Sequence, residues 1–156
     1  VRLAVVDGDV AVRVASGVGV VEWRGRRGWA RHDYCVLGTC TGLKPVVMAM
    51  DPAAPGRFSC RVRAGTLHFE ETGDYGDFFQ VVVDGDVLQA YCPEAGPAEI
   101  PGQVLVRRPD GCGSEHRFLI RCPEPGTHFD ILFDINAEDR RRTVHWAPAA
   151  LEALRA

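Results

Sequence analysis

The sequence predicts an all-β fold: an antiparallel β-sandwich or barrel, built from two related halves and followed by a short C-terminal helix. Two observations favour strands. Apolar residues recur with a period of two rather than 3.6, and clusters of Gly, Pro and Asp separate the apolar stretches. Alternation such as Arg61-Val62-Arg63 is typical of antiparallel strands with one wet and one buried face. A third observation, an internal similarity, suggests the two halves.

Each expected strand is a short stretch in which apolar residues alternate with polar ones or run continuously. In chain order these stretches cover residues 3–6, 10–14, 18–23, 45–50, 58–62, 66–70, 78–83, 87–92, 103–106, 117–122 and 129–133. Helical features occur only at the C-terminus, where Pro148 suits a first helical turn and Ala147, Leu151 and Leu154 share one face. We expect this helix to cover an open end or an edge strand.

The internal similarity lies at an offset of 77 residues: residues 5–35 match residues 82–112 at 12 of 31 positions. The match begins with the same Val-Val-Asp-Gly-Asp-Val segment and ends at Cys35 and Cys112. Chance is the alternative, because Asp-Gly between valine-rich runs is a common hairpin turn. Since 156 residues can share one core, we expect a single domain of two pseudo-repeats, 1–77 and 78–156.

The composition, 46% apolar and 25% charged residues, is that of an ordinary soluble globular protein. A net charge of -3 argues against a surface that is basic throughout and coats nucleic acid. No apolar run approaches the roughly 18 residues of a membrane span. The sequence does not fix the compartment, and a cytoplasmic location is slightly favoured over secretion because Asn136-Ala137-Glu138 is not a glycosylation sequon.

Six cysteines give the sharpest chemical signal, although none forms a C-x-x-C motif. The internal similarity makes Cys35 equivalent to Cys112, with Cys40 and His116 following them at similar spacings. A pseudo-twofold arrangement would bring these four residues together as a structural zinc site with three thiolates and one imidazole. Zinc is therefore the one cofactor that the sequence suggests.

Other interpretations of the cysteines remain open. Cys60, Cys92 and Cys122 lie on expected strands, where free cysteine behaves as a small buried hydrophobe. An even number of cysteines also allows disulfides, and Cys112 beside Ser114 and His116 allows a nucleophile. Calcium at the paired Asp-Gly-Asp turns is a further alternative, although turn chemistry alone explains these residues.

A basic and aromatic stretch at residues 23–32 is the candidate ligand-binding segment. Its residues are Trp23, Arg24, Arg26, Arg27, Trp29 and Arg31. Arginines suit phosphate or carboxylate contacts and tryptophans suit stacking, so we expect an anionic ligand or a protein partner there. The alternative is a solvated hairpin loop whose tryptophans belong to the flanking strands.

These observations favour a non-catalytic binding or interaction module that uses exposed loops of a β-sandwich. The alternative is a small β-barrel enzyme that acts on an apolar small molecule in the barrel mouth. A structural subunit forms a third class, which a large flat apolar patch would indicate. No Walker, Rossmann, metalloprotease or serine-hydrolase motif occurs in the sequence.

Overall fold

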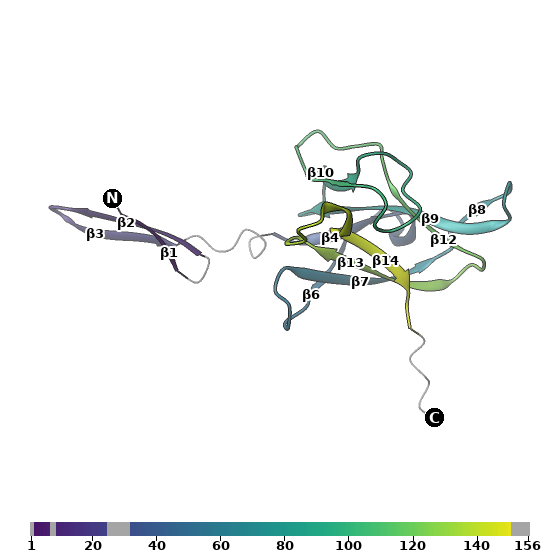
Figure 1. The fold of residues 1–156 in the computed structure, drawn as a ribbon, viewed down its shortest axis with the longest axis horizontal. Helices are drawn as coiled ribbons and strands as arrows, with labels where there is room; N and C mark the ends of the chain where they lie inside the picture. The colour runs from purple at the N-terminus through teal and green to yellow at the C-terminus, as the bar shows by residue number, and fades with distance from the viewer. Residues whose placement is uncertain (1, 7–8, 25–31, 151–156) are drawn as a thin grey trace, which may run out of the picture. The chain divides into compact units, whose positions relative to one another are not determined.

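A computed structural model describes residues 2–6, 9–24 and 32–150, and Figure 1 shows it as a ribbon. The described residues are mostly β-strand and the strands pair antiparallel, which confirms the predicted all-β class. Chain contacts divide the molecule into two compact units, Val1–His32 and Asp33–Ala156. This division falls elsewhere than the boundary at residue 77 expected from the internal similarity. Within the described ranges, no helix has the length and apolar character needed to cross a membrane.

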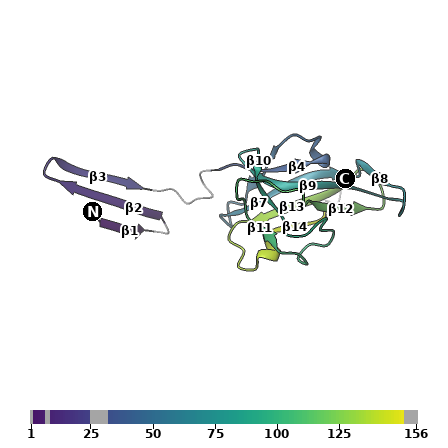
Figure 2. The ribbon, with the colours of Figure 1, turned by 90° about the horizontal axis from the view of Figure 1, so that it is seen from above.

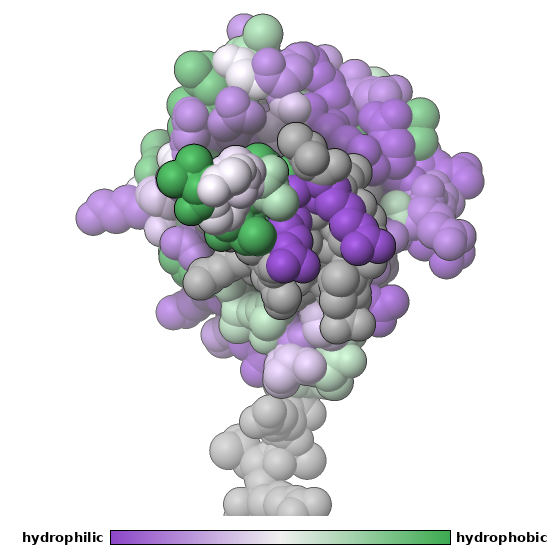
Figure 3. Space-filling model, turned by 90° about the vertical axis from the view of Figure 1, so that its left-hand side faces the viewer, coloured by the Kyte–Doolittle hydropathy of each residue, from purple (hydrophilic) through white to green (hydrophobic). Residues whose placement is uncertain are grey.

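The first unit holds a three-stranded meander of β1 (Arg2–Val6), β2 (Asp9–Ser16) and β3 (Gly19–Arg24). The turn between β2 and β3 is fastened by Ser16, whose hydroxyl donates to the carbonyl of Gly19 at 3.3 Å. Val14, Val20 and Val21 are all exposed. Figure 3 shows hydrophobic residues beside hydrophilic ones on the surface that faces the viewer. The three strands predicted here are confirmed.

The second unit holds two sheets, which Figures 1 and 2 show from two directions. The seven-stranded sheet has the order β11-β10-β9-β4-β5, and β8 and β12 also pair with β9. Its strands are β4 (Tyr34–Gly38), β5 (Val46–Val47), β8 (Leu67–Phe69), β9 (Asp74–Val83), β10 (Asp86–Pro93), β11 (Val106–Arg107) and β12 (Phe118–Cys122).

The second sheet of this unit has four strands in the order β14-β13-β7-β6. Its strands are β6 (Ala49–Met50), β7 (Arg57–Ala64), β13 (Thr127–Asp134) and β14 (Val144–Pro148). Two short 3-10 helices, η2 (Thr39–Thr41) and η3 (Arg140–Arg142), complete the described elements. The chain passes from one sheet to the other at Met48. Its N–H donates to Tyr34 O in β4, and the next residue begins β6.

Aromatic side chains join the two sheets into a β-sandwich-like core. The ring of Tyr34 in β4 lies 4.8 Å from Phe58 in β7 and 4.9 Å from Phe133 in β13. Phe79 in β9 meets Trp146 in β14 edge to face at 5.5 Å. Because neither described sheet closes on itself, the barrel alternative is wrong.

The predicted C-terminal helix is not shown, and its expected first residues belong to a strand. Ala147 and Pro148 end β14, where they pair with Asp130 and Phe129 of β13. Ala149 N–H then donates to His128 O at 2.8 Å, which continues the ladder past the proline. A proline at the end of an edge strand costs no inward ladder bond, so the strand accommodates it. The remaining expected helix, at residues 151–156, lies outside the described residues.

The structure does not show the predicted duplication, although the two segments share one strand pair. Val6 pairs with Asp9, and the equivalent Val83 pairs with Asp86, so both segments form hairpins with the same closing pair. Beyond that pair the two segments differ: β2 continues in regular register, whereas β10 shifts register between Asp86 and Ala90. A shared closing pair is what hairpin formation alone produces, so it does not establish a duplication.

Candidate functional site

A groove crosses the outer face of the four-stranded sheet. Each strand contributes one exposed residue to a single row: Ala49 pairs with Ser59, Ser59 with Leu132, and Leu132 with His145. Cross-strand partners lie on the same side of a sheet, so the row follows the groove from β6 to β14. The groove has a volume of about 890 Å³, within the usual range for ligand sites.

The two ends of the groove differ in what bounds them. Met50, Asp51 and Pro52 lie at the β6 end, whereas His145 in β14 and the terminal residue of η3, Arg142, lie at the other end. Pro101 and Gly102, from the connection between β10 and β11, complete the lining. Leu132 is 47% exposed at the centre of the row, which gives the floor an apolar surface.

Both carboxylates that line the groove already have partners. Asp134 accepts from Arg57 Nε at 3.2 Å and from the backbone N–H of Asn136 at 3.0 Å. Asp51 accepts from the backbone N–H of Ala53 at 2.9 Å. Asp134 is therefore already paired with a cation, whereas Asp51 is held by a backbone N–H.

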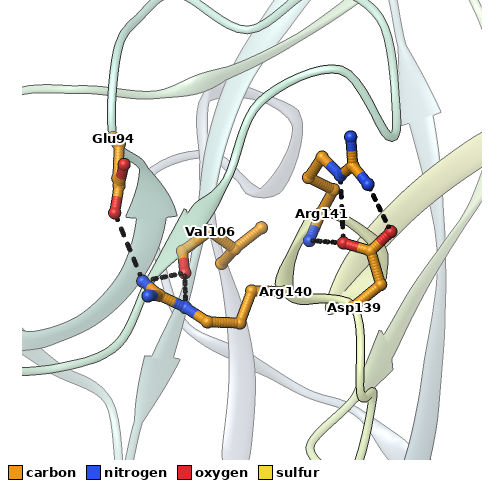
Figure 4. A network of polar contacts seen from close by, with 5 residues as sticks. All are labelled: Glu94, Val106, Asp139, Arg140 and Arg141. Atoms are coloured by element: carbon orange, nitrogen blue, oxygen red, sulfur yellow. Dashed lines mark hydrogen bonds and ion pairs between the residues drawn. The ribbon is translucent and has the colours of Figure 1, made fainter.

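Arg142 is the last of three consecutive arginines, of which the first two hold the structure together (Figure 4). Arg140 donates to Val106 O at 3.0 and 3.3 Å and to Glu94 at 3.3 Å, which ties η3 to β11 and to the residue that follows β10. Arg141 forms a two-point ion pair with Asp139, both contacts at 3.0 Å, and lowers the pKa of that carboxyl. Two-point ion pairs of this kind hold both side chains in one geometry and are stronger than single contacts.

The third arginine, Arg142, forms no ion pair with any described residue. It is exposed, as is His145 on the adjoining strand, and both line the groove. A fixed backbone therefore presents an unpaired guanidinium and an imidazole beside the apolar floor. This arrangement suits a ligand with an apolar body and an anionic group.

The sequence-predicted ligand segment cannot be placed as a site. Arg26, Arg27, Trp29 and Arg31 lie outside the described residues. Trp23 and Arg24 are the last residues of β3, where their backbones pair with Val12 and Ala11. The prediction of an anionic partner for residues 23–32 stays a prediction.

The four residues predicted as zinc ligands are all described, and the structure does not bring them together. Cys35 is buried in β4, whereas Cys112 is exposed on the connection between β11 and β12. Cys40 lies in η2, and His116 follows Cys112 on the same connection. Among the described residues no three His, Cys, Asp or Glu side chains are grouped to hold a metal ion. The inferred equivalence fails because Cys35 occupies a strand and Cys112 a loop.

The interpretation of cysteines as buried hydrophobes fits three of the six, whereas Cys40 and Cys60 are partly buried. All six are free, and Cys35, Cys92 and Cys122 are buried. Burial raises the pKa of Cys40 to about 12 and also raises that of Cys35. These thiols stay protonated at neutral pH, which makes them poor nucleophiles.

Sequence reasoning missed the groove, although one signal for it was present. In the alternating stretch 129–133, Phe129, Ile131 and Phe133 point to the core, which places Leu132 on the polar face. An apolar residue at an exposed position in the centre of a strand is such a signal. Nothing in the sequence showed that Arg142 would be the arginine left unpaired.

Comparisons with known proteins found no matching protein family, no matching curated protein and no matching solved structure.

Proposed function

We propose that this protein is a binding module that takes a ligand with an apolar body and an anionic group into the groove of the four-stranded sheet. The apolar body lies over Leu132 and Met50, and the anionic group meets Arg142 and His145. The observation that carries the proposal is the unpaired Arg142, held at the groove while its neighbours Arg140 and Arg141 are engaged.

The charges and the apolar surface of the groove both support a ligand with an apolar body and an anionic group. The carboxylate of Asp134 is already paired with Arg57, which reduces the attraction that it offers a cationic ligand. An anionic ligand instead gains a new charge-assisted hydrogen bond at Arg142. An apolar groove with a few convergent polar groups is the usual form of a small-molecule site.

Titration with sodium hexanoate tests the proposal, with hexylamine as the probe of opposite charge. We expect hexanoate to shift the backbone amide signals of Ser59, Leu132 and His145 in a nitrogen-15 spectrum, and hexylamine to leave them in place. Arg142→Gln should weaken hexanoate binding about fivefold, since one charge-assisted contact is lost.

Arg63→Gln is the matched control, because it removes the same charge from an exposed arginine of β7 that does not line the groove. It should leave hexanoate binding within about twofold of the original. Equal responses to the two probes, or equal losses in the two variants, would show that the groove does not select anions.

The alternative function, catalysis in a barrel mouth, has no barrel among the described residues to support it.

A further inference from the structure

A second hollow lies on the outer face of the seven-stranded sheet, separate from the groove. Its volume is about 490 Å³. Apolar side chains from β4, the turn after η2 and the start of β10 supply much of its lining: Leu37, Leu43, Val87 and Leu88. The opposite wall is the connection that carries Cys112, Gly113 and Ser114. The hollow is therefore open, largely apolar and bounded by a loop.

Gln80 in β9 fixes that loop and also lines the hollow. Only 4% of Gln80 is exposed, and its Nε2 donates to Ser114 O at 3.0 Å and to His116 O at 2.7 Å. A primary amide nitrogen has two hydrogens, so both are used and the amide cannot turn over. The position of its oxygen, Oε1, is fixed as a result.

In the described part of the chain, the oxygen of this amide has no partner. Oε1 of Gln80 accepts no hydrogen bond from the described residues. The one fully buried side-chain nitrogen or oxygen that lacks a partner in the described part of the chain is Nε of Arg121. Oε1 is therefore not fully buried, and Gln80 is one of the residues that line the hollow. A rigid acceptor beside an apolar floor suits a ligand that brings a hydrogen-bond donor.

Leu43 adds a second unusual feature at the same hollow. Its φ is 61°, in the left-handed region that a bulky residue rarely adopts, and the residue is 71% exposed. The backbone is held there by a hydrogen bond from Leu43 N to Gly38 O at 2.9 Å. Neither burial nor backbone preference explains a leucine at this position, whereas contact with an apolar ligand does.

We infer that this hollow binds a small neutral aliphatic molecule that carries an N–H donor, such as a primary amide. The donor meets Oε1 of Gln80, and the aliphatic part lies against Leu43, Val87 and Leu88. The ligand is neutral because the hollow carries one charge of each sign, Glu115 and Arg117. The inference is independent of the groove, which lies on the other sheet and selects an anion.

Hexanamide and N,N-dimethylhexanamide test the inference, because they share the aliphatic chain but only the first has N–H donors. Of the six cysteines, all within the described ranges, only Cys112 is exposed, so its reaction with a disulfide reagent reports occupancy. We expect hexanamide to slow this reaction and to shift the amide signals of Leu37, Leu88 and Gly113, at concentrations where the dimethyl amide has no effect.

Leu43→Asn separates a ligand-binding role from a structural one. Asparagine tolerates the left-handed backbone, so the midpoint of unfolding should stay unchanged or rise. Hexanamide binding should fall at least threefold. Ile100→Asn, which removes an exposed aliphatic side chain that does not line the hollow, should leave binding unchanged. Equal protection of Cys112 by the two amides, or unchanged binding in Leu43→Asn, would overturn the inference.

Discussion

The outer faces of the two sheets in the sandwich-like unit differ in the kind of side chain that they carry. On the four-stranded sheet, charged side chains of adjacent strands pair across the register, as Arg57 does with Asp134 and Arg61 with Asp130. On the seven-stranded sheet, Cys35, Val82 and Ala90 form a buried apolar cluster on the face turned away from the core.

The difference shows why one face has a groove on its strands and the other a hollow under a loop. Charged strand residues remain in solvent and need no cover. An outward apolar cluster needs a covering segment, and that segment must satisfy its own backbone groups. Gln80 does this for the connection between β11 and β12, helped by Gly113 N–H, which donates to Leu88 O at 3.1 Å.

The largest expected effect tests whether the loop depends on that one amide. Gln80→Leu removes two hydrogen bonds from the carbonyls of Ser114 and His116, although Arg117 still donates to both. We expect the free energy of unfolding to fall by about 1.5 kcal/mol, with faster amide exchange over residues 111–117. Denaturant unfolding and hydrogen exchange measure the two effects.

Ser59→Ala on the other outer face is the control, because Ser59 is exposed on a strand and lines the groove. It should change the free energy of unfolding by no more than about 0.5 kcal/mol. If both substitutions cost the same, the proposed contrast between a loop-covered face and a solvated face is wrong.

A smaller effect is expected at Asp110, which lies at the start of the loop. Its Oδ1 accepts from the N–H of Cys112 at 2.9 Å, and its other oxygen contacts Arg107. These two contacts, the backbone one first, lower the pKa of Asp110. Asp110→Ala should speed amide exchange at Cys112 about fivefold.

Asp110→Asn keeps the acceptor but not the charge, so exchange at Cys112 should stay within about twofold of the original. Because the pKa of Asp110 is lowered in the folded chain, its contribution is complete above the unfolded pKa of about 3.9 and is lost as pH falls below it. A loss of protection in Asp110→Asn equal to that in Asp110→Ala would show that the ion pair, rather than the acceptor, holds the loop.

Much of the strand pattern could be predicted because the strands of the four-stranded sheet have one wet face and one dry face. The alternating stretches around Phe58 and Phe129 became β7 and β13. β4 was missed because Tyr34, Cys35 and Val36 are all buried, which leaves no alternation to detect. β14 was missed because Pro148 was interpreted as the beginning of a helix.

The candidate site could be predicted far less well, because it depends on register and on which charges are already paired. His145 and Ser59 are 86 residues apart and share the groove only because both flank Leu132. The role of Gln80 depends on carbonyls that lie 34 and 36 residues further along the chain. Single-residue patterns carry no information on such partners.

The smallest expected effect concerns the pair Arg61–Asp130 on the solvated outer face. Arg61 Nε lies 2.8 Å from Asp130 Oδ1, and this contact lowers the pKa of Asp130. Both side chains are more than a third exposed, at 49% and 36%, so solvent screens their attraction.

A double-mutant cycle with Arg61→Gln and Asp130→Asn should give a coupling of about 0.5 kcal/mol at low salt, and less in 1 M sodium chloride. Since the pKa of Asp130 is lowered on folding, the coupling should be constant above about pH 4 and vanish as the pH falls below it. A coupling above about 2 kcal/mol, unchanged by salt, would mean that this face is held together by its charges and would remove the contrast between the two outer faces.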